Sequence, residues 1–223
     1  MNRIQIVPDS LAELRRTPKQ ERSRALVEAV LDTTDALLAD GLHPAELTTT
    51  KIAAAAGVSV GAVYQYFDDT EAIVAAVAAR HIDASSELMD AALDTIAADP
   101  DPIGTLVDLF AARYRAEPGY RALWFGPHLN ARLQAADRAG KETIARGVRQ
   151  AFVIARAGSG PTELSEQQAR AAVYAVDSLL QEAFRRDPEG DDGLLEEAKT
   201  MMRAYLPQVA PGATDREGGR DGR

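Results

Sequence analysis

The apolar residues of this 223-residue chain recur at three- and four-residue spacing over long segments, and breaks with glycine and proline separate those segments. Such spacing places apolar side chains on one face of an α-helix. Much of the apolar content is alanine, a strong helix former with little side-chain volume. No convincing series of alternating, strand-like segments accompanies it. The sequence therefore predicts an all-α fold.

The breaks divide the chain into a series of expected helices. They span residues 18–40, 51–56, 60–67, 71–98, 103–117, 120–125, 129–156, 165–187 and 193–205. The expected apolar face of the first helix consists of Leu26, Val30, Thr33 and Leu37. That of the long fourth helix consists of Ile73, Val77, Ala84, Leu88 and Ala91.

The charge of the chain is uneven. Its 25 Lys and Arg stand against 34 Asp and Glu, a formal net charge of −9, yet basic residues crowd positions 15–24. We interpret this as a mildly basic N-terminal end on an acidic body. The lack of cysteine excludes disulfides and thiolate metal sites. No apolar run suits a signal peptide or a membrane span, so we expect a cytoplasmic protein with no membrane partner.

The most informative stretch is residues 47–67, LTTTKIAAAAGVSVGAVYQYF. It predicts two short helices joined by a tight turn at Gly57, where a left-handed backbone favours glycine. The residues expected to face inward or to fill the turn are Ile52, Ala56, Val58, Val63 and Phe67. This is the construction of a helix-turn-helix, whose second helix lies in the major groove of DNA.

The outward side of the second helix suits DNA. Val60, Gly61 and Ala62 are small enough to let the helix lie deep in the groove, and Tyr64 and Gln65 can reach base edges or phosphates. Similar helix pairs occur in proteins that never touch DNA, but the complete run with its flanking helices favours DNA binding. The predicted DNA-binding residues are Thr48, Thr49, Thr50, Lys51, Ser59, Val60, Gly61, Ala62, Tyr64, Gln65 and Tyr66.

Residues 17–79 resemble the DNA-binding domain of the tetracycline-repressor (TetR) family. The matching elements are the run IAAAAGVS at 52–59, then Gly61, Tyr64 and the pair Tyr66-Phe67 that leads into the long helix. The resemblance implies a three-helix head, a helical body, a homodimer formed through the last two long helices, and repression that a ligand in the body relieves. The DNA contacts it implies are Thr49, Thr50, Ser59, Gly61, Ala62, Tyr64 and Tyr66.

One position departs from the family pattern. Thr70 stands where the family commonly has a lysine that meets a phosphate, and Asp68 and Asp69 beside it repel phosphate. We expect either a weaker phosphate grip or one shifted to Arg22 and Lys51.

The expected domain organisation has four parts. A flexible arm spans 1–17, the helix-turn-helix domain 18–70, the ligand-binding and dimerisation body 71–206, and a disordered tail 207–223. Two helices of the body carry apolar stripes that cover either the protein's own core or a dimer interface. These stripes are Ala169, Val173, Val176, Leu180 and Phe184, then Leu195, Ala198, Met202 and Tyr205.

Aromatic and polar residues cluster in the body, which suggests a pocket for a small, partly hydrophobic effector. At the level of single residues, an ordinary core position remains the alternative. The candidate ligand-binding residues are His81, Phe110, Tyr114, Trp124, Phe125, His128, Phe152, Tyr174 and Asp177.

An enzyme is the main alternative class. The three histidines are far apart, and neither a phosphate-binding loop nor a nucleophile elbow is present. We predict no catalytic residue, metal or cofactor. The expected partners are double-stranded operator DNA, a small-molecule effector and a second copy of the chain. A regulator that works without an effector, and an activator, remain open.

Overall fold

The computed structural model of the chain describes residues 14–125, 131–155 and 164–206. Within these segments the chain forms nine α-helices, one short 3₁₀ helix and no β-strand, which confirms the all-α prediction. The elements are α1 (Glu21–Ala39), η2 (Pro44–Glu46), α2 (Thr49–Ala55), α3 (Val60–Val63), α4 (Thr70–Ala98), α5 (Pro102–Ala116), α6 (Pro118–Trp124), α7 (Ala131–Ala155), α8 (Glu166–Arg186) and α9 (Asp192–Tyr205).

Short polar side chains mark where the helices begin. Asp69 accepts the backbone N–H of Ala72 at 2.7 Å at the start of α4, and Ser165 accepts that of Gln168 at 3.1 Å at the start of α8. Such caps satisfy N–H groups that have no partner in the first turn of a helix. Capping residues can be recognised in the sequence. Apart from the end of α3, the observed helix bounds lie within about three residues of the predicted ones.

Helix α3 ends at Val63, whereas the sequence predicted a helix to Phe67. Beyond Val63 the amides of Gln65 and Tyr66 donate to carbonyl oxygens three residues earlier, at 3.3 and 2.9 Å. These bonds wind the chain more tightly than an α-helix does. Side chains after Tyr64 therefore leave the face that a continuous helix would give them.

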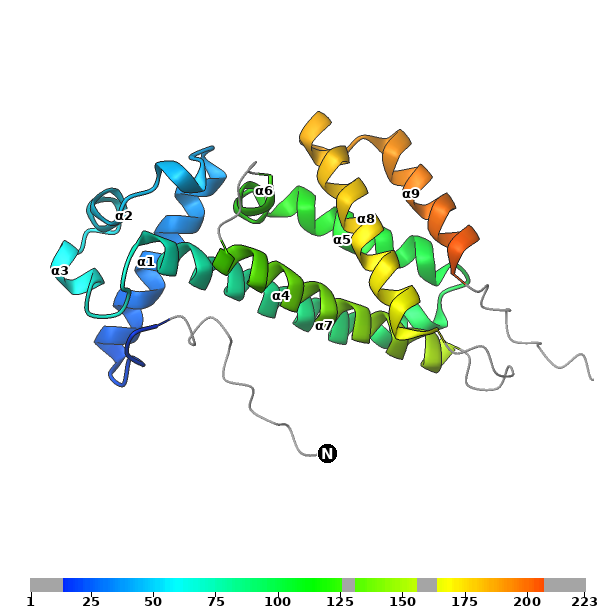
Figure 1. Cartoon of the computed structure of the whole chain (residues 1–223), viewed down its shortest axis with the longest axis horizontal. Coiled ribbons are helices and arrows are strands. Elements are labelled where there is room, and N and C mark those ends of the chain that lie inside the picture. Colours follow the sequence, from blue (N-terminus) through cyan, green and yellow to red (C-terminus); the bar gives the residue numbers. More distant parts are fainter. Residues whose placement is uncertain (1–13, 126–130, 156–163, 207–223) are drawn as a thin grey trace, which may run out of the picture.

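Helices α1, α2 and α3 gather at one end of the molecule, at the left in Figure 1, and the first turns of α4 pack against them. We call this unit the head and the remaining helices the body. The expected division between them at residue 70 stays a prediction, because α4 is continuous across it. The most deeply buried side chains of the head include Val27, Val30, Leu38, Ile52, Val63, Phe67, Ile73 and Val77.

Two predicted helix faces are corrected. Ala84 and Ala91 on α4 are exposed and Leu88 is half-buried, because α7 packs on a different face, the one that carries Met89 and Leu93. In α1 the predicted face is offset from the buried face: Val30 is buried, but Leu26, Thr33 and Leu37 are only half-buried. The buried residues of α1 are Val27, Val30, Leu31, Thr34 and Leu38.

Helix α4 joins the head to the body, where α7 lies along it (Figure 1). Gly147 on α7 permits the close approach, since a Cβ there would lie 2.6 Å from the Cγ of Met89. Helix α6 forms a second contact between the units by packing against α1. The head is therefore held against the body at two places.

Helices α5, α8 and α9 pack together to complete the body. Leu180, Phe184, Leu195 and Met202 are buried within the chain, so the apolar stripes of α8 and α9 cover mainly its own core. Tyr205 is the exception, with 47% of its surface exposed. No helix in the part of the chain that the structure describes has the length and apolar character to cross a membrane.

Candidate functional site

The turn between α2 and α3 has the geometry that the sequence predicted. Gly57 has a backbone φ of +67°, a left-handed conformation that side chains with a Cβ rarely adopt. Ile52 and Val63 are fully buried on either side of the turn, and Val58 is half-buried within it. The predicted inward face of the helix-turn-helix is thus observed.

The outer surface of α3 is open. Ser59 caps the helix by accepting the N–H of Ala62 at 3.2 Å. A Cβ added at Gly61 would meet nothing within 4 Å. Tyr64 is 45% exposed, and Gln65 is exposed beside it. Val60 and Ala62 are half-buried. The outer face of α3 therefore consists of small side chains, with Tyr64 as its exposed aromatic ring.

The start of α2 adjoins this surface. Thr48 caps the helix by accepting the N–H of Lys51 at 3.2 Å, and the side chains of Thr50 and Lys51 are exposed. The ammonium of Lys51 donates to the backbone carbonyl of Glu46 at 2.9 Å. This contact holds the charge on the outer face of the head.

Two predicted DNA contacts lie inside the head instead. Thr49 is only 7% exposed, and its hydroxyl lies 3.0 Å from that of Thr70. Tyr66 is 9% exposed because the tight turns after α3 carry its ring into the core. Both side chains are therefore largely covered within the head, and Thr70 has a structural partner in Thr49.

The two acidic residues before α4 each have a basic neighbour. Asp68 lies 3.5 Å from Arg15, and Asp69 lies 3.6 Å from Arg132 at the start of α7. These exposed pairs reduce the repulsion that the two carboxylates would exert on phosphate.

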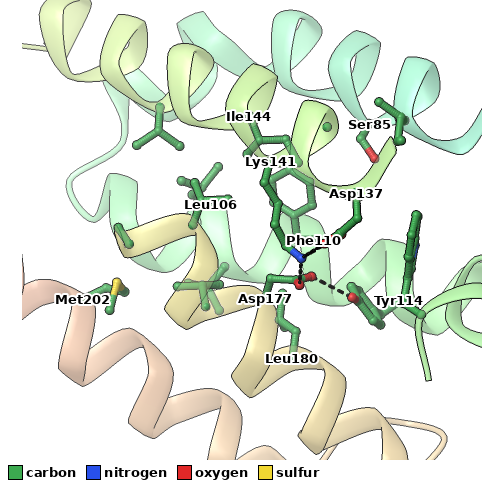
Figure 2. Close-up of a pocket in the computed structure, with 18 of the residues that line it drawn as sticks. Ser85, Leu106, Phe110, Tyr114, Asp137, Lys141, Ile144, Asp177, Leu180 and Met202 are labelled. Carbon is green, nitrogen blue, oxygen red and sulfur yellow. Dashed lines mark hydrogen bonds and ion pairs between the residues drawn. The ribbon is translucent and has the colours of Figure 1, made fainter. Parts of the chain in front are cut away.

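A cavity lies inside the body, between α4, α5, α6, α7, α8 and the end of α9 (Figure 2). About 80 Å³ of it is open to the centres of water molecules, which is room for roughly six waters. Its walls are mainly apolar. Four of the candidate ligand-binding residues line it, namely Phe110, Tyr114, Trp124 and Asp177.

The other candidates lie elsewhere. Phe152 is buried away from the cavity, Tyr174 is 36% exposed, and Phe125 packs outside the lining at 6.3 Å from the ring of Tyr114. His128 lies outside the described residues. His81 faces the head, as shown below.

A charged cluster interrupts the apolar wall of the cavity, as Figure 2 shows. The ammonium of Lys141 lies 2.6 Å from a carboxylate oxygen of Asp137 and 2.9 Å from one of Asp177. The hydroxyl of Tyr114 donates to Asp177 at 2.9 Å. Burial alone lowers the pKa of Lys141, but the charge of Asp177 and the hydrogen bonds to both carboxylates raise it above its usual value.

The sequence reading missed Lys141 and Asp137. The only signal was their four-residue spacing on a helix, and charged pairs at this spacing are usually solvated.

A second polar cluster connects the cavity to the head. Arg113 is 5% exposed, and it donates to the hydroxyl of Ser85 in the cavity wall and to the carbonyl of His81 at 2.8 Å. It also lies 3.1 Å from Glu117. His81 in turn lies 3.1 Å from Glu117 and 2.8 Å from Asp35 in α1.

Electrostatics favour the charged form of this second cluster. Burial alone lowers the pKa of His81, but its hydrogen bonds to Asp35 and Glu117 outweigh burial and raise the pKa above its usual value. The hydrogen bond between His81 and Glu117 also lowers the pKa of Glu117. His81 is thus placed to hold the head to the body rather than to line the cavity. No group of residues suited to hold a metal ion occurs in the described parts of the chain.

Comparison with known families gives two matches. Residues 31–77 match the family described as bacterial regulatory proteins of the tetR family, and residues 98–210 match the tetracyclin repressor-like C-terminal domain. The second match alone covers just over half of the chain. Neither family model describes an enzyme, and no curated protein sequence matches the chain.

Solved structures of similar fold include transcriptional regulators. A TetR-family transcriptional regulator from Streptomyces coelicolor is 27% identical, with a TM-score of 0.61 over 81% of this chain and 96% of that one. FadR from Bacillus subtilis, in complex with stearoyl-CoA, is 14% identical, with a TM-score of 0.61 over 82% and 96%. SmeT, in complex with triclosan, is 22% identical, with a TM-score of 0.60 over 88% and 100%. The chain belongs to the TetR family of transcriptional regulators.

Proposed function

We propose that the protein is a ligand-responsive transcriptional repressor. A homodimer binds a palindromic operator through its two helix-turn-helix units, and a small, partly hydrophobic effector in the cavity releases the DNA. The observation that carries the proposal is the line of buried polar contacts from Ser85 at the cavity wall through Arg113 and His81 to Asp35 in α1. An occupant of the cavity has a direct physical route to the head.

The proposed DNA-reading surface consists of the outer face of α3 and the start of α2. Gly61 and Ala62 allow close approach to the groove floor, and the exposed ring of Tyr64 reaches a base edge. Thr50 and Lys51 meet phosphates. The full proposed set is Thr48, Thr50, Lys51, Ser59, Val60, Gly61, Ala62, Tyr64 and Gln65.

Recognition of a specific operator requires two heads, and we propose that the chain dimerises through α8 and α9 to supply them. One short reading helix meets only a few base pairs, whereas two heads about 34 Å apart read successive major grooves of a palindrome. Both helices carry exposed apolar side chains in addition to their buried stripes. These are Tyr174 on α8 and Met201 and Tyr205 on α9.

The proposed release of DNA is a shift in population. A ligand changes the operator affinity only to the extent that it binds two shapes of the body differently. An occupant that displaces Tyr120 or Ser85 moves Arg113, whose guanidinium lies 4.5 Å from the centre of the Tyr120 ring. Because Arg113 also holds His81, the displacement changes the contact with α1 and hence the spacing of the two heads.

The structural relatives give this proposal chemical support. FadR from B. subtilis is described in complex with stearoyl-CoA and SmeT in complex with triclosan, so two proteins of this fold bind molecules with a large apolar part. The mainly apolar cavity of this chain suits an effector with the same property. We infer that the protein acts in the cytoplasm, where operator DNA lies.

The test is a titration of the full-length protein onto DNA fragments from upstream of its own gene and its neighbours. It is run at two salt concentrations with random DNA as competitor. We expect tight, competitor-resistant binding to one fragment, with two chains per site and protection of a palindrome. Weak, salt-sensitive binding to every fragment alike would refute sequence-specific repression.

A compound screen and an assay for turnover separate the two alternatives. A regulator that works without an effector binds one fragment tightly, but no compound in a broad screen raises its melting temperature or releases the DNA. An enzyme converts the bound compound to product, which mass spectrometry of the incubated mixture detects.

A further inference from the structure

We propose that the cavity takes a small organic cation, with a compact apolar body and one protonated amine held beside Asp137 and Asp177. This inference rests on the proposed function, because it names the chemical class of the effector. Four features of the cavity carry it: its charge, its inventory of hydrogen-bonding groups, its rings and its size.

The charge of the cavity wall is unbalanced. Two carboxylates, Asp137 and Asp177, face the single ammonium of Lys141. All three side chains are largely buried, at 22%, 18% and 12% exposure. In such surroundings an uncompensated charge is costly and a ligand of opposite sign relieves it. The excess charge is negative, so the favoured ligand is a cation.

The neighbouring basic groups do not cancel this excess. Arg113 contacts the wall through Ser85 and the ring of Tyr120, and its charge is paired with Glu117 at 3.1 Å. His81 lies between Glu117 and Asp35 and faces the head. Both of these basic side chains therefore already have carboxylate partners.

The hydrogen-bonding groups point to the same class. The ammonium of Lys141 has three N–H donors, and it contacts both oxygens of Asp137 and one oxygen of Asp177. Its donors are thus taken up. The two carboxylates together have about eight lone-pair positions. Lys141, Tyr114 and Gln181 supply the protein donors found for these oxygens among the described residues. A ligand that donates hydrogen bonds therefore finds spare acceptors, whereas Asp137 and Asp177 repel a ligand carboxylate.

The rings and the size of the cavity define the rest of the molecule. Phe110, Tyr114, Tyr120 and Trp124 line the same space, and aromatic faces attract cations as well as apolar groups. The open volume of about 80 Å³ favours a compact molecule. A phenyl ring with a two-carbon amine requires the cavity to widen, since a benzene ring alone occupies a cavity of roughly 150 Å³.

The test uses three probes of nearly the same shape on the full-length protein, measured by calorimetry. They are 2-phenylethylamine as the cation, 2-phenylethanol as the neutral probe and phenylacetate as the anion. We expect one amine per chain, bound at least tenfold more tightly than the alcohol, with phenylacetate weakest. An alcohol that binds as tightly as the amine, or an anion that binds best, would overturn the proposal.

A matched pair of variants tests the residue assignment. Asp137→Asn removes the excess charge while it keeps the side-chain size, so affinity for the amine falls at least tenfold and affinity for the alcohol stays within twofold. Asp108→Asn, at a 62% exposed carboxylate outside the cavity lining, leaves both unchanged. Equal effects of the two variants on amine binding would refute the role of Asp137. Unfolding midpoints of both variants are measured alongside.

The operator titration distinguishes the two levels of failure. If the protein binds one fragment tightly but prefers the neutral or anionic probe, the repressor proposal stands and the cationic class is refuted. If no probe binds at all, the effector site is refuted as well. If the protein binds no fragment specifically, the repressor proposal fails whichever probe it prefers.

Discussion

Replacement of Arg113 by methionine tests whether the buried polar cluster holds the body to the head. Methionine keeps the apolar length of the side chain and removes its charge and donors. Arg113 is almost fully buried, and its loss removes one donor from Glu117 and one from the carbonyl of His81. Removing one partner of a buried ion pair costs about 3–5 kcal/mol.

The partial exposure of Glu117, at 38%, places the expected loss at the lower end of that range. We expect the free energy of unfolding to fall by about 3 kcal/mol. For a chain of this size that loss corresponds to a melting temperature about 6–12 °C lower. Urea unfolding followed by circular dichroism measures the free energy, and a thermal scan measures the midpoint.

Arg115→Met, two residues along the same helix, is the matched control. Arg115 is 40% exposed and donates to the backbone carbonyl of Glu189 at 2.9 Å. Its loss should cost less than about 1 kcal/mol, because solvent replaces an exposed partner. If Arg113→Met and Arg115→Met lose the same stability, the buried cluster does not hold the body to the head.

Four further changes test the head and its contact with the body. Tyr64→Ala should weaken binding to the specific operator by about 1–3 kcal/mol and spare binding to random DNA; an unchanged operator affinity would remove the ring from the reading surface. Lys51→Ala should weaken binding to all sequences and flatten the salt dependence by about one unit, which titrations at several salt concentrations measure. The free energy of unfolding should fall as pH rises through the pKa of His81, because the raised pKa stabilises the fold only while the ring is protonated; His81→Gln should flatten this dependence, and an equal slope in both proteins would exclude the histidine. Gly57→Ala should cost about 1–2 kcal/mol of stability, because its φ of +67° strains any residue with a Cβ, and a chemical denaturation curve that matches the wild type would contradict that reason.

The sequence predicted the helix-turn-helix well because its determinants are local. The turn depends on the conformation of Gly57, and the start of α3 depends on the cap by Ser59. The burial of Tyr66 could not be predicted in the same way. The chain tightens after Val63, so the angle between successive side chains no longer follows a regular helix.

The interior of the body was harder to predict because its charged residues break the usual rule. Arg113 and Lys141 lie on amphipathic helices, where charged side chains normally face solvent. Their burial depends on partners far along the chain, Ser85 for one and Asp177 for the other. Phe110 and Trp124 could be predicted because Phe and Trp side chains are usually largely buried.

Thr49 illustrates the same limit within the head. Its hydroxyl meets that of Thr70, twenty-one residues later. The resemblance implied a DNA contact at Thr49 and, at Thr70, only the absence of a lysine. Only the packing of α2 against the start of α4 reveals that the two threonines form a pair.

The central claim is that occupation of the cavity changes the grip of the head on DNA. The most direct test is the affinity for the selected operator fragment, measured by fluorescence anisotropy with and without saturating amounts of the probe that binds the cavity most tightly. We predict at least a fivefold loss of operator affinity, and an equal loss of probe affinity when the protein is already bound to DNA, since coupling between two sites is reciprocal. A probe that binds the cavity and leaves the operator affinity unchanged, or increases it, would contradict the account.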